Sequence, residues 1–215
     1  MEKFCKAEAI VLATTDFSDA HRVVTFFTRE FGKIEANAYG CRRAKSPISG
    51  AMQIFNHILL EFARTSPVYR VQDADIIDFY KINEDLTRIA YASIFFEIVN
   101  KMTTFEQIDD DVFNLLINSL KAFDKRNPRI ANLVSSCQFI KISGFALEYP
   151  KSMENVFALI LNFDWKDTTK FSLKSTELES AEKILLNSIQ SILESPLKSL
   201  KFLELINSAD KLLTK

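Results

Sequence analysis

Glycine, cysteine and histidine are scarce in this chain of 215 residues, which has 4 Gly, 3 Cys and 2 His. Few Gly beside many Leu, Ile and Phe favour a helix-rich chain. Three Cys cannot all be paired, and no two of them form a Cys-x-x-Cys motif. A complete disulfide set and a structural zinc site are therefore not expected, and a reducing cytoplasm is the expected compartment.

Long apolar runs and catalytic motifs are also missing. No uncharged apolar stretch reaches the roughly 18 residues of a membrane-spanning helix, and the first residues lack the apolar core and cleavage site of a signal peptide. Neither a Gly-x-Ser-x-Gly motif nor a phosphate-binding Gly loop occurs, and both His stand outside any motif. We expect a cytoplasmic protein without membrane partner, catalytic residue, metal or cofactor.

The net charge of −1 does not indicate a nucleic-acid-binding protein, so any such site must come from local clustering. One cluster stands out at Arg42, Arg43 and Lys45. It follows two apolar runs that turn at Phe31-Gly32, and these runs are rich in β-branched, aromatic or alternating apolar residues. The cluster therefore lies in a loop that follows a predicted antiparallel strand pair.

The first 80 residues contain five predicted strands, at 7–14, 22–28, 33–39, 54–64 and 68–77. A basic loop, 41–52, separates the third from the fourth. Five short strands with a loop or short helix at that place fit an oligonucleotide-binding (OB) barrel.

From about residue 83 the apolar period changes to 3.6, which predicts helices. They are expected at 86–102, 112–123, 128–143 with Gly144 as the stop, 178–192 and 195–213. Thr176 and Glu179 form a predicted capping box, and Ser195-Pro196 a predicted helix start. Residues 156–163 fit a strand or a helix. We therefore expect an α+β chain, with a DNA-binding OB domain at 1–80 and a helical domain at 81–215.

Matches in order and spacing carry a family resemblance: Arg22, Val24-Thr25, Phe27-Thr28, Gly32-Lys33-Ile34, Gly40, Arg42-Arg43, Lys45-Ser46 and Gly50. This pattern resembles the amino-terminal domain of the RecO family of recombination mediators. Similarity continues through residues 68–102 and returns near 195–206. The chain departs at Tyr39, where the family usually has Lys, and at Cys41, where it usually has Ala.

The resemblance implies a function in DNA repair. RecO-like proteins bind single- and double-stranded DNA, promote strand annealing and act with RecR to load RecA onto coated single strands. It also implies a nucleoid-associated protein of the RecF pathway. The rival interpretation is a protein–protein adaptor whose barrel does not bind DNA, as the net charge of −1 allows. A nuclease ranks below both.

The candidate DNA-binding residues surround the basic loop. Arg42, Arg43 and Lys45 are expected to contact phosphates, with Lys33, Arg64 and Arg70 nearby. Tyr39 offers a π-face to a base or packs on the barrel. The alternative for the cations is a solvated loop.

The resemblance also implies a site in the helical domain for the acidic tail of single-stranded-DNA-binding protein. The family carries basic side chains on the helix before the turn at residues 143–145, where this chain has Leu133 and Val134. Arg129 or Lys141 is expected to supply the charge, with Leu133 and Cys137 lining the pocket.

A zinc module follows that turn in many RecO proteins. Here no Cys or His follows Gly144. We expect a degenerate module at about 150–174, replaced by apolar packing around Phe157, Leu161, Phe163 and Trp165.

We predict that the purified protein holds no zinc, because a structural zinc site needs Cys or His ligands that this region lacks. Elemental analysis is the measurement, and about one zinc per chain would contradict the prediction.

Overall fold

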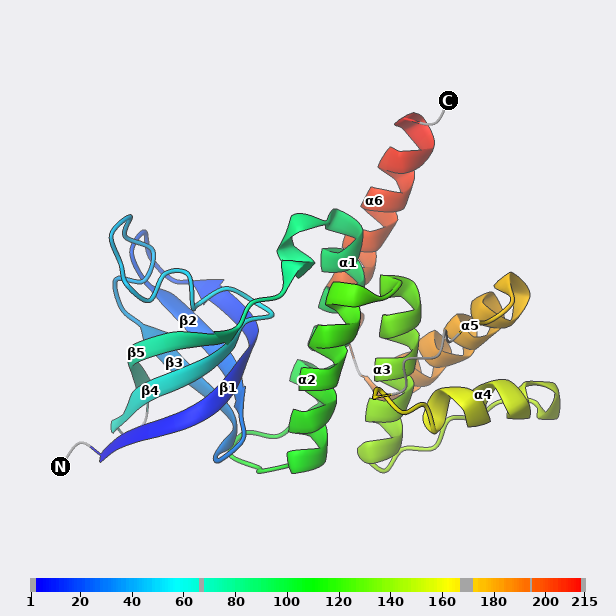
Figure 1. The fold of residues 1–215 in the computed structure, drawn as a ribbon, viewed down its shortest axis with the longest axis horizontal. Helices are drawn as coiled ribbons and strands as arrows, with labels where there is room; N and C mark the ends of the chain where they lie inside the picture. The colour runs from blue at the N-terminus through cyan, green and yellow to red at the C-terminus, as the bar shows by residue number, and fades with distance from the viewer. Residues whose placement is uncertain (1–2, 66–67, 167–171, 194, 214–215) are drawn as a thin grey trace. The chain divides into compact units, whose positions relative to one another are not determined.

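The computed structural model describes residues 3–65, 68–166, 172–193 and 195–213. The chain forms two compact units. Unit 1 comprises residues 1–81 and 102–117, and unit 2 comprises residues 82–101 and 118–215. The fold class is confirmed: a five-stranded closed barrel is followed by helices (Figure 1).

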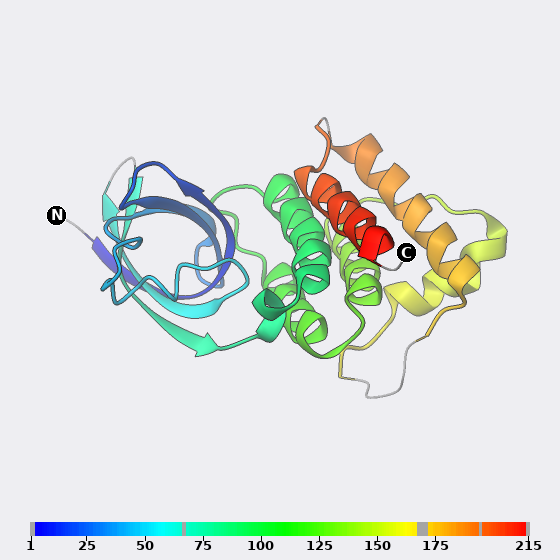
Figure 2. The ribbon, with the colours of Figure 1, turned by 90° about the horizontal axis from the view of Figure 1, so that it is seen from above.

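The barrel has strand order β1-β2-β3-β5-β4, and its strands curve into a ring in Figure 2. Strand β1 is long and pairs with β2 along its second half and with β4 along its first half. The strands are β1 (Lys3–Asp16), β2 (Arg22–Thr28), β3 (Gly32–Ala38), β4 (His57–Thr65) and β5 (Val68–Asp78). Each predicted strand is confirmed, with shifts of a few residues at the ends.

Alternate residues of the strands fill the barrel, as the two-residue period of a strand requires. Alanines of β1 and β3 pair in register with larger residues of neighbouring strands, at Ala7↔Leu60, Ala9↔Ile58 and Val24↔Ala36. Four residues of the loop after β3 join this core and are buried: Cys41, Ile48, Ala51 and Met52. The strand residues of the core are Ala7, Ala9, Val11, Val24, Phe26, Ile34, Ala36, Ala38, Ile58, Leu60, Phe62, Val71 and Ala74.

Strand β3 meets β5 in a short parallel seam, at Ala36↔Tyr69 and Asn37↔Arg70. Nearer the start of β3 than this seam, a segment of unit 1 at 103–107 pairs with the same strand. The Glu106 N–H donates to the Lys33 carbonyl at 2.8 Å, and Lys33 forms an isolated parallel bridge with Phe105. The segment therefore covers the part of the β3 edge that β5 leaves.

Gly32 lets this segment approach closely. Its φ is +66°, in the left-handed region that glycine adopts readily. A Cβ at this position would lie 2.0 Å from the Gln107 carbonyl oxygen. Both the backbone angle and the contact therefore require glycine.

An ion network surrounds the buried His57 ring and links β1, β4 and β5. The His57 ring lies between two carboxylates, with Nε2 2.8 Å from Glu8 and Nδ1 3.0 Å from Asp78. Glu8 also accepts from Arg29 Nε at 2.8 Å. Burial tends to raise the pKa of Glu8, but hydrogen bonds from Arg29 and His57 outweigh it and lower the pKa. The Arg29 guanidinium lies 4.2 Å from the Phe113 ring centroid.

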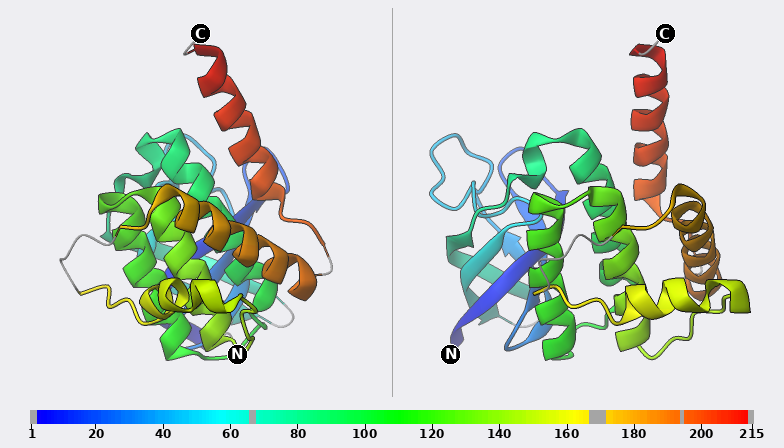
Figure 3. Two further views of the ribbon diagram at one scale, coloured as in Figure 1. Left: turned by 90° about the vertical axis from the view of Figure 1, so that its right-hand side faces the viewer. Right: turned by 45° about the vertical axis from the view of Figure 1, so that its right-hand side comes forward.

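The helices begin and end largely where the sequence predicts. They are η1 (Lys81–Glu84), α1 (Leu86–Met102), α2 (Asp110–Lys125), α3 (Pro128–Ile142), η2 (Lys151–Met153), α4 (Glu154–Leu161), α5 (Ser175–Ile192) and α6 (Lys198–Leu213). In unit 2, α6 extends beyond the other helices (Figure 3). The Asn127 side chain caps α3, and Gly144, with φ +81°, follows its end as predicted.

Helix α3 is the centre of unit 2. Residues 131–137 are buried without interruption, so every face of this part of the helix is covered. Phe95 of α1 packs against Phe96, Phe123 and Phe139, with ring centroids 5.8 to 6.3 Å apart. Many of the 19 Phe of the chain therefore build cores.

Of residues 156–163, which fit a strand or a helix, residues 156–161 lie in α4 (Glu154–Leu161). Gln138 of α3 supports the end of this helix, because its side-chain amide donates to the Ile160 and Phe163 carbonyls and accepts from Trp165 Nε1. Phe157 is fully buried and stacks on Tyr149 at 4.3 Å. Residues 167–171 of the expected degenerate module lie outside the described residues.

The predicted capping box of Thr176 and Glu179 is wrong. Helix α5 begins at Ser175, and the Glu177 carboxylate accepts from the Lys174 N–H at 3.0 Å. The contact that caps the helix is thus made by Lys174 and Glu177, two residues before the predicted pair, Thr176 and Glu179.

Helix α6 begins at Lys198, after the predicted Ser195-Pro196 start, because a carboxylate of α1 caps it there. Glu97 accepts from the Lys198 N–H at 3.0 Å, and from the Ser199 N–H and hydroxyl at 2.8 and 2.7 Å. Lys101 donates to Ser195 Oγ and to the Pro196 carbonyl. Two residues of α1 thus hold the start of α6.

Replacing Gly32 by Ala should destabilise the barrel by at least about 1–3 kcal/mol, the usual strain of a non-glycine residue in an unfavourable backbone region, with the clash at Gln107 adding to it. Urea unfolding followed by circular dichroism measures this. The control is Gly50→Ala, because Gly50 has no atom within 4 Å of the added Cβ and no positive φ. Equal stability of the two variants would contradict the role of Gly32.

Replacing Glu97 by Ala should weaken the docking of α6 by about 1 kcal/mol, the usual contribution of a helix cap. Burial tends to raise the pKa of Glu97, but hydrogen bonds from Ser199 and Lys198 lower it below its usual 4.5. A depressed pKa contributes stability above the unfolded value, and that stability is lost as pH falls through the folded value. The protection factors of the α6 amides, which correct for the intrinsic pH dependence of exchange, should therefore fall below about pH 4.5 in the wild type but not in Glu97→Ala. Glu204→Ala, on the exposed side of α6, should behave as wild type.

Candidate nucleic-acid interface

The basic loop is held against the β1–β2 loop by Asp16 and Arg42. The Asp16 carboxylate lies 2.8 Å from Arg22 Nε and 3.4 Å from Arg42 Nε. The hydrogen bond from Arg22 and the charge of Arg42 lower the pKa of Asp16. Arg42 also donates to the Ser18 carbonyl through its guanidinium and to the Ala20 carbonyl through its N–H. Arg42 therefore positions the loop.

Arg43 and Lys45 are the cations that this loop presents to solvent. Their backbone forms consecutive turns, in which the Arg43 N–H donates to the Gly40 carbonyl and the Ser46 N–H to the Arg43 carbonyl. Both side chains are exposed, and neither forms an ion pair with any residue that the structure describes. Their charges are available to an anion such as a phosphate.

An aromatic cluster lies beside the loop. The Tyr39 ring, just after β3, packs edge-on against Phe17 at 6.1 Å and against His21 at 5.2 Å, and Phe17 stacks on His21 at 5.5 Å. The Arg70 guanidinium of β5 lies 5.2 Å from the centroid of Tyr39. Of the predicted residues, Tyr39 and Arg70 are thus brought together next to the basic loop.

Lys33 lies apart from this group. It is 4% exposed, and its ammonium donates to the Thr103 carbonyl and lies 4.5 Å from the centroid of Phe105. Burial lowers the pKa of Lys33. The expectation that Lys33 lies beside the loop with a free charge is corrected: its amino group binds the 103–107 segment.

Arg64 is also engaged at that segment. Its guanidinium lies 3.3 Å from the Glu106 carboxylate, which accepts from the Tyr69 hydroxyl as well. The charge of Arg64 is neutralised within unit 1. The predicted cations thus divide into Arg43, Lys45 and Arg70, which form no ion pair with a residue that the structure describes, and an engaged group, Arg42, Lys33 and Arg64.

The residues predicted to bind the partner tail differ in their exposure and in their contacts. Leu133 and Cys137 are fully buried, so they cannot line an open pocket, and burial raises the pKa of the Cys137 thiol. Arg129 forms a bidentate ion pair with Glu182, at 2.6 and 2.7 Å. Lys141 is exposed and its ammonium lies 3.4 Å from Asn162 Oδ1.

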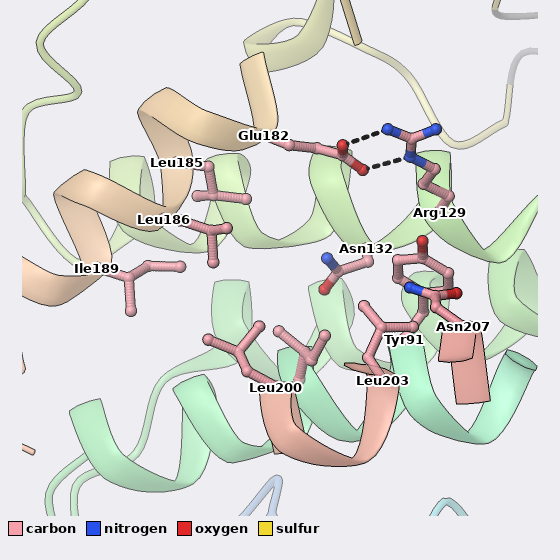
Figure 4. Close-up of a pocket in the computed structure, with 11 residues that line it drawn as sticks. Tyr91, Arg129, Asn132, Glu182, Leu185, Leu186, Ile189, Leu200, Leu203 and Asn207 are labelled. Carbon is pink, nitrogen blue, oxygen red and sulfur yellow. Dashed lines mark hydrogen bonds and ion pairs between the residues drawn. The ribbon is translucent and has the colours of Figure 1, made fainter. Parts of the chain in front are cut away.

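A pocket of about 370 Å³ opens beside Arg129 in unit 2 (Figure 4). Leucines and isoleucines of α1, α5 and α6 form its apolar side. The Arg129–Glu182 pair forms the polar side with Tyr91, Asn132 and Asn207 (Figure 4). The apolar lining residues are Ile94, Leu185, Leu186, Ile189, Leu200 and Leu203.

The part of the chain that the structure describes contains no group of three or more His, Cys, Asp or Glu side chains arranged to hold a metal ion. Among the described helices, none has the length and apolar character needed to cross a membrane.

Comparison with known proteins identifies the family. Residues 1–80 match the family model described as Recombination protein O N terminal, and residues 83–153 match Recombination protein O C terminal. The chain belongs to the RecO family. The RecO resemblance carried by the strand–turn–basic-loop pattern is thereby confirmed.

Similar relatives are bacterial proteins named DNA repair protein RecO. The one from Caldicellulosiruptor bescii is 28% identical over 154 residues, which is 71% of this chain and 63% of the relative. Those from Halalkalibacterium halodurans and Bacillus cytotoxicus are 29% and 31% identical, over 67% and 66% of this chain and 58% of each relative. The chain thus spans less than two thirds of the length of these relatives.

The RecO match ends at residue 153, before α4. Seven of the 11 residues that line the pocket therefore lie beyond it, on α5 and α6.

Sequence reasoning missed Phe17 and His21. Both lie in a loop that appears only polar when the sequence is considered alone, and Tyr39 is 18 residues or more further along. A large aromatic residue within a polar loop was the available signal for Phe17.

Proposed function

We propose that this chain is a recombination mediator that binds single- and double-stranded DNA through its barrel. The observation that carries the proposal is the presence of exposed cations, Arg43 and Lys45, on a loop that Asp16 and Arg42 hold in place. Cations fixed on a small barrel suit contact with phosphates, which requires no sequence readout. The names of the relatives, DNA repair protein RecO, support this function.

The mechanism is one of binding energy. Each phosphate that a cation neutralises releases counterions, so affinity depends steeply on salt. A surface that attracts two backbones raises the local concentration of complementary strands and thus promotes annealing. We further propose that the protein acts with RecR in loading RecA onto coated single strands. No step of this function breaks a covalent bond.

Replacing Arg43 and Lys45 together by Ala should weaken DNA binding and flatten its salt dependence. On single strands, the slope of log K against log salt should change by roughly 0.7 for each phosphate that the protein no longer neutralises. Fluorescence titration at several salt concentrations measures this. Adding Arg42→Ala should weaken binding further, because the loop is then no longer tied to Asp16 and Ser18.

The control variant is Lys6→Ala/Lys121→Ala, which removes the same net charge from exposed positions outside the loop. It should keep the wild-type slope. An unchanged slope in the loop variant with normal circular dichroism would mean that the loop is only solvated. No salt-dependent binding by the wild type would favour the adaptor, and magnesium-dependent cleavage would reveal a nuclease.

We also propose that unit 2 binds the tail of single-stranded-DNA-binding protein. That tail is acidic and ends in an apolar residue with a free carboxylate, so it needs an apolar pocket beside a cation. The pocket next to Arg129 supplies both (Figure 4). Arg129 already binds Glu182, so the tail must compete with this carboxylate and is expected to bind weakly.

Replacing Glu182 by Gln should tighten tail binding by at least about fivefold, because it releases Arg129 and a hydrogen bond to a charged group contributes roughly 1.5–3 kcal/mol. A tail-peptide titration measures this. Glu179→Gln removes the same charge from the exposed side of α5 and should have little effect. Binding that neither Arg129→Ala nor Lys141→Ala weakens would place the site elsewhere.

A further inference from the structure

We propose that Phe17, Tyr39 and Arg70 form a platform on which unpaired nucleobases stack, so that this end of the barrel favours single-stranded over duplex DNA. The inference rests on the proposed DNA-binding function. It goes further by stating which part of the strand is recognised here and by which side chains.

The exposure of the rings is the first observation. Phe17 is 47% exposed and Tyr39 46%, although each ring contacts the other. Single exposed aromatic residues are ordinary on protein surfaces, but a cluster of them marks a contact site. His21 stacks on one face of Phe17 and Arg70 lies over one face of Tyr39, so the exposed fraction of each ring belongs to the remaining face and the edges. An exposed π-face is what any base can stack on.

The rings are held in place before any ligand arrives. The Gly40 N–H donates to His21 Nδ1 at 2.8 Å, and His21 packs against both Phe17 and Tyr39. Gly40 has φ +71°, so the backbone turns here in a way that glycine adopts readily. Preorganised side chains lose little conformational entropy on binding.

The charges around the rings point to a nucleic acid and not to an apolar partner. Arg70 lies over Tyr39 at 5.2 Å, and the exposed cations Arg43 and Lys45 stand on the loop that Tyr39 begins. Sites for single-stranded nucleic acid combine aromatic rings, on which bases stack, with cations that contact phosphates, and both kinds of side chain lie side by side here. A duplex keeps its base faces stacked inside, so it can use the cations but not the rings.

The test compares two strands that share phosphates and differ in bases: oligothymidine, and an abasic strand of the same length. Phe17→Leu/Tyr39→Leu removes both π-faces and keeps apolar side chains. It should weaken oligothymidine binding by roughly 5- to 100-fold for each ring that stacks a base. Binding of the abasic strand, binding of a duplex and the salt slope should stay unchanged.

The matched control is Phe4→Leu, because Phe4 is an aromatic residue that is 68% exposed and lies at the other end of β1. It should bind oligothymidine as the wild type does. Tyr39→Phe keeps the ring and should retain affinity.

Three results would overturn the inference while the proposed function stands: equal wild-type affinity for the two strands, undiminished binding by the double variant, or equal weakening on both strands. Failure of the wild type to bind either strand would instead overturn the proposed function. A second measurement needs no variant. Photo-crosslinking of the wild type with a strand containing 5-bromodeoxyuridine should modify peptides with Phe17 or Tyr39, and crosslinks confined to other peptides would overturn the platform.

Discussion

The short parallel seam between β3 and β5 determines most of what is distinctive in unit 1. Pairing extends over Ala36↔Tyr69 and Asn37↔Arg70, and beyond it the two strands separate. At one end of the seam, Arg70 reaches the Tyr39 ring. At the other end, the segment 103–107 pairs with the β3 edge, where Thr103 accepts from the Lys33 ammonium and Glu106 forms an ion pair with Arg64. The seam therefore separates Arg70, beside Tyr39, from Lys33 and Arg64, which the 103–107 segment engages.

A net charge near zero is compatible with a cationic patch because the acids of unit 1 are placed selectively. Asp16 lies beside Arg22 and Arg42, Glu106 beside Arg64, and Glu8 beside Arg29 and His57. These exposed or half-buried pairs add little stability individually, but they fix positions. Arg43 and Lys45, which form no ion pair with a described acid, then stand together on one loop, where their fields add.

The sequence was sufficient for the barrel, the helices and the basic loop, because each of these depends on local period and turn chemistry. It was insufficient where a segment far away in the sequence determines whether a side chain is buried or exposed. Lys33 is buried by Thr103 and Phe105, about 70 residues away, and no local pattern announces such a contact. Leu133 and Cys137 were expected at a surface because their spacing suggests one apolar stripe. Small residues around them, such as Ala131 and Ser135, in fact indicate a helix that is covered on every face.

The contact between Gly32 and Gln107 has a consequence for how the protein is divided in the laboratory. A fragment that ends at residue 81 would contain all five strands but not the segment 103–107. The edge of β3 at Gly32 and Lys33 would then be uncovered, and the Lys33 ammonium would lose the Thr103 carbonyl. Exposed strand edges pair readily with other chains. A clone of the barrel alone is therefore expected to aggregate, and the functional barrel module includes a strand-like segment encoded some 70 codons downstream of the edge that it covers.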